Sequence, residues 1–336
     1  EWINFNQQYY KFYINADGIY RVNYNKLVQL GLQNVPGSQF AVYNLGREVP
    51  IYVSTSGVLG ASDFILVPCN RRDGTYDNGL YDQPGNNPNI FTSATFRSNP
   101  YFLTYGTGQR ERYELRENPI PTTPPTAAPY VKYNMNATDL YFIPGFSNST
   151  SNNYYSSAFD RSEGMGISGI STAAKTFNTN LLNYNFQPPD STAYNTYYFS
   201  LSNTNLSANN NIRVKINGVE VFDTILPPVT YIRKSIRIPS TLLTNANTNL
   251  EFTGTSHFNV FEYSFSNYRQ STFVGFTPSN YFNFTLPREY NYYEFPTPGI
   301  GDGVFFYLFD RTNKKVYKTT RTSATLQRVM TDASSQ

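Results

Sequence analysis

The chain has 336 residues, with 26 lysines and arginines against 23 aspartates and glutamates, and a formal net charge of +3. Charged residues make up only 15% of it, whereas aromatic residues reach 17% through 30 tyrosines and 26 phenylalanines. This combination excludes ordinary disorder, which is rich in charge and poor in aromatic residues. The small, dispersed positive charge also argues against nucleic acid as a partner, because phosphate binding requires clustered lysine and arginine.

Helix signals are nearly absent from the first 118 residues, where β-branched and aromatic residues dominate the periodic stretches. Two strands, over residues 10–14 and 19–22, flank Asp17-Gly18, a pair that favours a tight hairpin turn. Residues 25–31 are predicted to form a short helix, capped by Asn25 and ended by Gly31. A long polar loop is expected over residues 70–88. Further strands are predicted at residues 39–44, 49–53, 63–67 and 101–105.

A boundary follows, because five of the eleven residues from 119 to 129 are proline. Such a segment cannot join a central strand, and it favours an extended connector. Beyond it, Asn217-Gly218 predicts a hairpin between two alternating stretches. Strands are predicted at residues 131–142, 194–201, 212–216, 219–225, 231–238, 249–253 and 259–267. A final pair is expected at residues 304–308 and 315–319, around a turn that begins at Asp310.

These elements predict an all-β fold, because many short strands at regular spacing are typical of a sandwich or jelly roll. We expect an N-terminal β-rich domain over residues 1–118 and a Pro-rich linker over 119–130. A jelly-roll-like β-sandwich then covers residues 131–288. A small β extension over 289–336 would lead toward a catalytic domain that this chain does not contain.

A series of short motifs follows the same order as in a known peptidase family. The motifs are Trp2, Tyr9-Tyr10-Lys11, Asp17-Gly18-Ile19-Tyr20-Arg21, Tyr24, Leu27, Gly31, Gly46–Val53, Gly60–Ile65, Arg72–Asp77, Leu80-Tyr81, Phe91-Thr92 and Tyr101–Thr104. In this order they resemble the N-terminal region of C25-family (gingipain-like) cysteine peptidases, the group tied to type IX secretion in Bacteroidetes. Shorter matches are Glu163-Gly164-Met165, Pro287-Arg288 and Phe306–Asp310.

The resemblance implies a non-catalytic region, because the family's catalytic histidine and cysteine motifs lie beyond the part that matches. Such a region would belong to an exported peptidase or secretion component. It would pack against, or position substrate for, a downstream catalytic domain in cis, or bind a secretion-system protein.

Export also fits the composition, because low charge with abundant Asn, Ser, Thr and Tyr is typical of exported surface proteins. We expect a secreted or cell-surface protein, associated with the outer membrane, whose signal peptide has been removed. The apolar runs are too short to span a bilayer, so no transmembrane segment is expected.

No catalytic constellation is evident, so we expect this chain not to be an enzyme by itself. A nucleophile–base pair would have to join Cys69 and His257, the single cysteine and the single histidine. Cys69 ends an apolar run and is better explained as a half-buried strand residue, and His257 as a solvated turn residue. Nor does the sequence contain the Gly-x-Ser-x-Gly motif of a serine nucleophile.

The polar loop offers a candidate metal site, because Asp73, Asp77 and Asp82 could supply hard oxygen ligands to Ca²⁺. The spacing lacks the Asp-x-Asp-x-Asp-Gly pattern and the terminal glutamate of an EF-hand. The simpler interpretation is a turn whose aspartates accept hydrogen bonds from backbone N–H groups. No other cofactor is expected.

The aromatic residues suggest an alternative function, a self-standing cell-surface adhesin or carbohydrate-binding module, with a glycan as partner. Candidate binding or interface residues are Tyr197, Tyr198, Tyr292 and Tyr293. Strand alternation would instead place one ring of each pair in a core. A contiguous apolar patch would favour a docking role, whereas a groove with stacked rings and convergent polar groups would favour a glycan.

Overall fold

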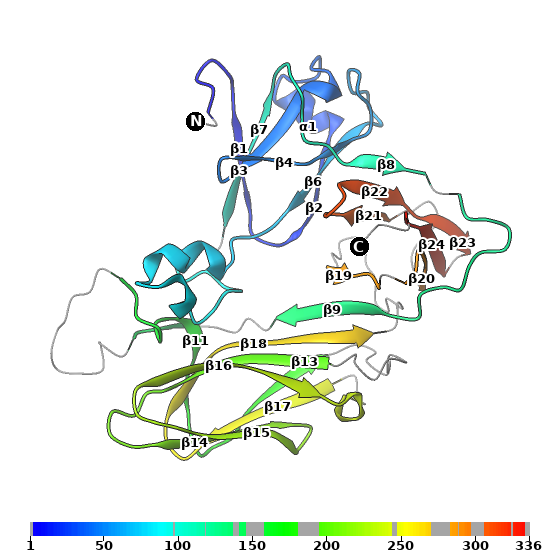
Figure 1. Ribbon diagram of the computed structural model, residues 1–336. Helices are drawn as coiled ribbons and strands as arrows, with labels where there is room; N and C mark the ends of the chain where they lie inside the picture. The colour runs from blue at the N-terminus through cyan, green and yellow to red at the C-terminus, as the bar shows by residue number, and fades with distance from the viewer. Residues whose placement is uncertain are drawn as a thin grey trace.

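The computed structural model describes residues 3–96, 98–117, 119–136, 141–145, 158–180, 195–243, 247–269, 283–287, 289–296, 306–323 and 325–332. Three β units follow one another along its long axis: a first sandwich, a central module and a second sandwich (Figure 1). The all-β prediction is confirmed. Within these ranges no helix combines the length and apolar character needed to cross a membrane. Trp2, Arg288 and residues 137–140 of a predicted strand lie outside the described residues.

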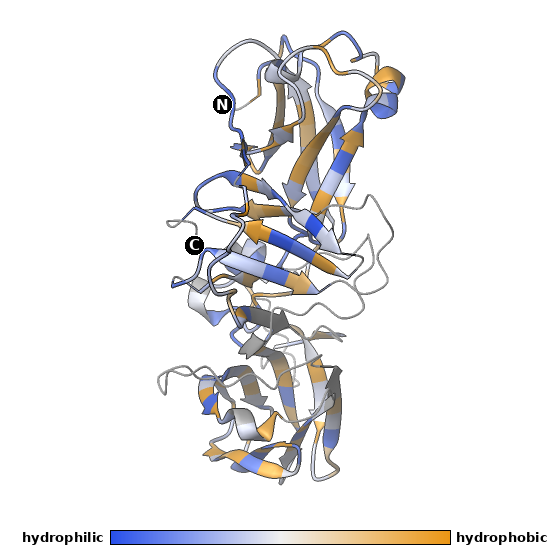
Figure 2. Ribbon diagram, turned by 90° about the vertical axis from the view of Figure 1, so that its right-hand side faces the viewer, coloured by the Kyte–Doolittle hydropathy of each residue, from blue (hydrophilic) through white to orange (hydrophobic). Residues whose placement is uncertain are grey.

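The first sandwich consists of two antiparallel sheets, of orders β1-β7-β3-β4 and β2-β6-β5. Alternate residues of both sheets point inward, and Phe40, Val42 and Ile65 are fully buried between them. Apolar residues line these strands in Figure 2. The strands are β1 (Tyr10–Ile14), β2 (Gly18–Asn23), β3 (Phe40–Asn44), β4 (Arg47–Val49), β5 (Tyr52–Val53), β6 (Phe64–Cys69) and β7 (Asn99–Tyr105).

The predicted hairpin at Asp17-Gly18 is wrong, because β1 pairs with β7 whereas β2 pairs with β6. The turn carries the chain from one sheet to the other. Gly18 does not adopt a positive φ, so the property that favoured a hairpin is not used. Tyr10 and Phe12 of β1 and Tyr20 of β2 therefore pack against the same core from opposite sheets.

The predicted short helix exists as α1 (Tyr24–Gln29), but its N-cap lies two residues earlier than expected. Asn23, and not Asn25, is the N-cap, and its side chain accepts a hydrogen bond from the backbone N–H of Lys26 at 3.0 Å. Gly31 follows the helix with φ +73°, the left-handed conformation that ends many helices.

The second sandwich places the sheet β10-β11-β18-β13-β16, extended by β9 and β19, against the sheet β12-β17-β14-β15. The hairpin predicted at Asn217-Gly218 is confirmed: β14 and β15 are antiparallel, and the two turn residues have φ of 49° and 82°. The strands are β9 (Val131–Asn136), β10 (Tyr141–Ile143), β11 (Gly164–Ile170), β12 (Lys175–Asn180), β13 (Asn195–Asn203), β14 (Asn210–Ile216), β15 (Val219–Leu226), β16 (Thr230–Ile238), β17 (Asn247–Gly254), β18 (Phe258–Arg269) and β19 (Phe284–Thr285).

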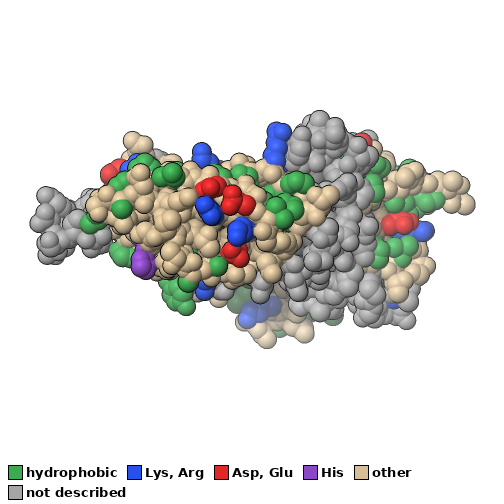
Figure 3. Space-filling view, turned by 90° about the horizontal axis from the view of Figure 1, so that it is seen from below, with side chains coloured by type: hydrophobic (Ala, Val, Ile, Leu, Met, Phe, Trp, Pro, Cys, Tyr) green, Lys and Arg blue, Asp and Glu red, His purple; other side chains and the backbone are tan. Residues whose placement is uncertain are grey.

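The two faces of β14 show why this sequence forms a sandwich. Ile212, Val214 and Ile216 are fully buried in the core. The alternating residues face outward, where Arg213 lies 3.8 Å from Asp223 and Lys215 lies 3.8 Å from Glu251. Acidic and basic side chains lie side by side on this end of the molecule when it is seen from below (Figure 3). Exposed pairs of this kind contribute little stability, so burial of the apolar face dominates.

The central module is formed by the C-terminal strands, which fold back between the two sandwiches (Figure 1). Its sheets have orders β20-β24-β23 and β21-β22-β8, and β8 runs parallel to β22. The sequence does not predict that the strand just before the Pro-rich linker joins the last strands of the chain. The bounds are β8 (Glu114–Arg116), β20 (Tyr292–Pro296), β21 (Tyr307–Asp310), β22 (Lys315–Lys318), β23 (Thr320–Ser323) and β24 (Leu326–Met330).

Candidate interface site

The polar loop over residues 70–96, here called the junction loop, is held in shape by its own aspartates. It contains the 3-10 helices η2 (Gly74–Leu80) and η3 (Pro84–Asn86). Asp73 is the N-cap of η2 and accepts the backbone N–H of Thr75 at 3.0 Å. Asp77 is buried, and its carboxylate accepts from Ser93 Oγ at 2.9 Å, Ala94 N at 2.6 Å and Thr95 Oγ1 at 2.8 Å. These bonds fix the return path of the loop.

Asp73 and Asp77 thus bond groups of the loop itself, while the Ca²⁺ site stays a prediction. Among the residues described, no group of three or more His, Cys, Asp or Glu side chains is placed to hold a metal ion, so Asp82 does not join the other two. Both side chains accept hydrogen bonds from backbone N–H groups of the loop, as the simpler interpretation of the sequence predicts.

Asn89 connects the junction loop to the second sandwich. Its side chain is 2% exposed, and its Nδ2 donates to the carbonyl oxygens of Met165 at 3.0 Å and Phe261 at 2.6 Å. Its Oδ1 accepts from the N–H groups of Phe91 and Thr92, both at 2.9 Å. All hydrogen-bonding positions of the amide are thus used, and only an amide can donate and accept in this way.

Further hydrogen bonds join the loop to the outer face of the sheet that contains β13 and β16. Ser200 Oγ donates to the carbonyl oxygen of Pro88, and Arg233 Nη2 to that of Asn87, both at 2.8 Å. Tyr81 OH donates to the carbonyl oxygen of Glu163 at 2.7 Å. The contact is therefore polar and specific in orientation.

The Glu163-Gly164-Met165 motif lies at this contact. Gly164 has φ +152°, and a Cβ there would lie 3.0 Å from Tyr81 Oη and 3.1 Å from Pro88 Cγ. A larger residue would push the junction loop away. Burial raises the pKa of the Glu163 carboxyl, and the nearby Asp160 carboxylate adds to that rise, whereas a bond from the N–H of Asp160 opposes it.

The first sandwich meets the central module through aromatic side chains. Tyr52 and Phe64 lie beside Tyr307, with ring centroids 6.1 and 6.2 Å from the Tyr307 ring. Phe309 meets Tyr113 edge-on at 5.0 Å. Backbone hydrogen bonds run alongside, from Tyr113 N to Ile51 O and from Glu114 N to Lys314 O, both at 2.9 Å. This contact is mainly apolar, unlike that of the junction loop.

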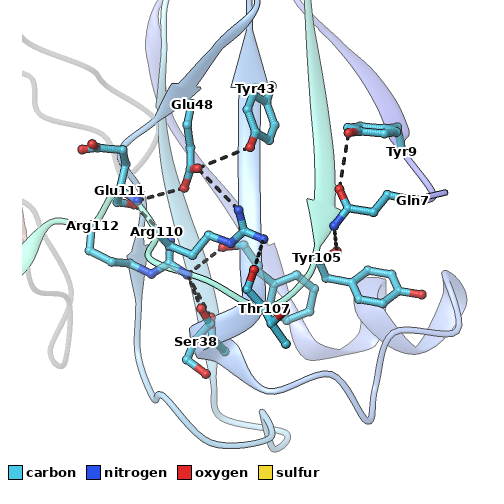
Figure 4. Close-up of polar contacts among 12 residues, drawn as sticks. Gln7, Tyr9, Ser38, Tyr43, Glu48, Tyr105, Thr107, Arg110, Glu111 and Arg112 are labelled. Carbon is cyan, nitrogen blue, oxygen red and sulfur yellow. Dashed lines mark hydrogen bonds and ion pairs between the residues drawn. The ribbon is translucent and has the colours of Figure 1, made fainter. Parts of the chain in front are cut away.

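A cluster of charged residues fixes the segment that leaves β7 for the central module (Figure 4). Glu48 accepts the backbone N–H of Glu111 at 2.8 Å and lies 3.6 Å from Arg110. Arg112 Nη2 donates to the carbonyl oxygens of Ser38 at 3.0 Å and Phe40 at 2.6 Å, next to the 3-10 helix η1 (Gly37–Gln39). Burial lowers the pKa of Arg112. No local sequence pattern predicts this role, because the acceptors are backbone groups distant in sequence.

Three of the four candidate binding tyrosines are core residues, which corrects their assignment to a binding surface. Tyr197 is fully buried and stacks on Phe265 at 4.6 Å. Tyr293 is fully buried, and its hydroxyl donates to Tyr290 O at 2.7 Å. Tyr292 is 1% exposed. Tyr198, at 39%, is the candidate that reaches the surface. Strand alternation thus buries Tyr197 and exposes Tyr198, whereas Tyr292 and Tyr293 are both buried because both faces of β20 are covered.

Cys69 and His257 lie in different units. Cys69 belongs to the core of the first sandwich, where burial raises the pKa of its thiol. His257 is exposed in the turn between β17 and β18 of the second sandwich. The structure therefore does not bring the two together as a nucleophile and a base.

The fold and its two junctions define an all-β protein of several packed units. No known family model matches the chain, and no curated protein sequence resembles it significantly. Among solved structures, dimeric latent PorU from Porphyromonas gingivalis is similar over 95% of this chain, with a TM-score of 0.55 and 13% sequence identity. The aligned part is 30% of PorU, so the chain spans less than a third of that protein's length. The likeness shows a PorU-like fold.

Two carbohydrate-related structures are also similar, at lower scores. The carbohydrate-binding module CBM36, solved with calcium and xylotriose, aligns with 40% of this chain and 98% of its own, at 11% identity and a TM-score of 0.22. The isomalto-dextranase of Arthrobacter globiformis aligns with 76% of this chain and 34% of its own, at 10% identity and a TM-score of 0.21. At these scores neither structure carries an argument.

Proposed function

We propose that this chain is the non-catalytic N-terminal region of an exported gingipain-like peptidase or type IX secretion component, and that it packs against, or positions substrate for, a downstream catalytic domain. One observation carries the proposal: the PorU-like fold extends over 95% of the chain, across both sandwiches and the central module. The order of sequence motifs in residues 2–104 supports the same family independently.

The junctions suit a positioning role. A region that orients another domain must hold its own units in a fixed arrangement, because each loose joint adds conformational freedom that is lost on docking. Here the polar contact at Asn89 sets the orientation of the second sandwich, and the aromatic contact at Tyr307 holds the central module. The chain acts as a scaffold and contributes no catalytic group of its own.

The alternative, an adhesin or carbohydrate-binding module, has less support. Three of its four candidate tyrosines are buried. Both functions require export to the cell surface, which would be tested by fractionating cells that produce the natural protein.

The first experiment is to read the gene beyond the codon for Gln336. A continuation that encodes catalytic histidine and cysteine motifs would support the proposal, and a stop codon would contradict a peptidase partner in cis. The second is to produce the continuation separately and measure its binding to this chain by calorimetry. Saturable binding supports packing between the two, whereas no interaction would contradict it. Peptidase turnover by the isolated chain would contradict the non-catalytic role.

A further inference from the structure

The chain enters and leaves the second sandwich through a shared neck, formed by residues 128–133 and 284–292. The entering strand β9 pairs antiparallel with the leaving strand β19, and the register places Tyr133 opposite Phe284. Farther from the sandwich, Tyr130 OH donates to Glu289 Oε1 at 2.6 Å. In Figure 1, β9 and β19 lie between the central module and the other strands of the second sandwich. The second sandwich is therefore an insertion whose two ends meet, as is typical of inserted domains.

The inserted sandwich has a hydrophobic core of its own. Phe199, Ile212 and Phe252, from both of its sheets, are fully buried in that core. The first sandwich and the central module instead share a core, in which Tyr52 of the former and Val316 of the latter are both buried. The strand β8, which leaves the first sandwich, also pairs with β22. The molecule therefore consists of two bodies: the first sandwich with the central module, and the second sandwich.

The neck is fixed at its base in the central module. Ala128 N donates to Tyr292 O at 2.9 Å, and Ala128 is buried in the same cluster as Tyr293. Between this base and the second sandwich, the neck is a two-stranded ribbon near Tyr130 and Glu289. A two-stranded ribbon is less stable than strands packed within a larger sheet, so it bends more easily. The neck is thus the place where a hinge can form between the two bodies.

The junction loop is a second attachment between the two bodies, and its contact is polar. Asn89 donates to the carbonyl oxygens of Met165 and Phe261. From the other side, Ser200 and Arg233 donate to carbonyl oxygens of the loop. Water can replace each of these hydrogen bonds at little net cost. Domains that meet through a polar interface are expected to move relative to each other, whereas a large apolar interface would hold them together.

We infer that the second sandwich is a movable module, with the neck as its hinge and the junction loop as the latch that holds it closed. With the latch closed, the two bodies keep the arrangement seen in the structure. When water replaces the hydrogen bonds of the latch, the second sandwich rotates about the neck as a folded body, because its own core is not part of the latch. This inference goes beyond the proposed function and does not depend on a peptidase partner.

The test measures a distance between the two bodies in the full chain, by double electron–electron resonance between two spin labels. The labels are attached to Ala16→Cys, in the turn before β2, and Leu206→Cys, in the turn before β14, which are both exposed positions. The native Cys69 is buried, so the label does not reach its thiol. We expect a single narrow distance distribution in the chain whose latch is intact.

Asn89→Asp should open the latch while the loop itself stays folded. The aspartate still accepts the N–H groups of Phe91 and Thr92, but it cannot donate to the second sandwich. We expect a broader distance distribution with a shifted maximum. Asn34→Asp makes the same change at an exposed position of the first sandwich, and should leave the distribution unchanged.

A second variant opens the latch from the other side, and decides the question if Asn89→Asp does not fold. Ser200→Ala combined with Arg233→Met removes both donors of the second sandwich and should also broaden the distribution. Amide hydrogen exchange in β14 should stay as slow as in the wild type, which separates rotation from unfolding. An unchanged narrow distance in a folded latch variant, a broad distance in the wild type, or fast exchange throughout β14 would each overturn the inference.

Discussion

The two junctions of this molecule are built from opposite chemistry. At the junction loop, the buried amide of Asn89, the buried hydroxyl of Ser200 and the guanidinium of Arg233 bond backbone carbonyls. Between the first sandwich and the central module, rings such as Tyr307 and Phe309 supply the contact. Apolar burial gives free energy without fixing direction, whereas buried polar groups must be satisfied and therefore permit only one arrangement. The comparison suggests that the first junction determines orientation and the second supplies stability.

The strongest test of the polar junction is Asn89→Asp. The new carboxylate would face the carbonyl oxygens of Met165 and Phe261, which accept hydrogen bonds from the amide in the native chain. We expect the free energy of unfolding to fall by more than about 3 kcal/mol, because two hydrogen bonds are replaced by a buried carboxylate oxygen that faces two carbonyl oxygens. Urea unfolding measures the loss. Asn34→Asp, at an exposed position, is the control, and equal stability of the two variants would contradict the role of Asn89.

The aromatic junction is tested by Phe309→Ala. Removing a ring that meets Tyr113 edge-on should cost about 3 kcal/mol, the lower end for a phenylalanine that is only partly buried. Phe5→Ala, at a side chain 83% exposed, should be nearly neutral. In this variant, backbone amide hydrogen exchange should become faster in β21 and β8 at a point where exchange in β13 has not yet become faster. Uniform acceleration throughout would show that the junctions are not separate.

Arg112→Met tests the anchor between the first sandwich and β8. The variant keeps the apolar stem but leaves the carbonyl oxygens of Ser38 and Phe40 without their charged donor. We expect the free energy of unfolding to fall by about 2 kcal/mol, which is typical of losing hydrogen bonds to a charged group. Arg47→Met serves as the exposed control. If both variants unfold at the same urea concentration, the carbonyl contacts of Arg112 contribute nothing measurable.

The smallest effect is expected at Glu163. The pKa of its carboxyl is raised in the folded chain, so ionisation of this group destabilises the fold. The contribution of the carboxyl to the free energy of unfolding is largest below its ordinary pKa. It is lost as the pH rises through the pKa of the folded state. Glu163→Gln should therefore be more stable than the wild type at pH 7, by roughly 0.5 kcal/mol given partial exposure. The difference should vanish near pH 4. A difference that grows toward acid pH would reverse the assigned sign.

Much of the fold was predictable because strand alternation is local. Ile212-Arg213-Val214-Lys215 predicts which side chains of β14 enter a core, and Asn217-Gly218 predicts the turn that follows. The candidate site was only partly predictable. Asp73 and Asp77 were recognisable as turn-forming residues, yet the buried partners of Asn89 lie 76 and 172 residues away. No local pattern distinguishes such an asparagine from one in solvent.

The sequence by itself determined the all-β class, most strand positions and the chemistry of the turns, since these depend on propensity and on period-two alternation. Apart from local hairpins such as β14–β15, tertiary structure decided which strands pair. It made the Asp17-Gly18 turn a crossing between sheets, buried both Tyr292 and Tyr293, and joined β8 to β22 across the linker. These outcomes depend on long-range packing, where the burial available at a position is set by elements that are distant in sequence.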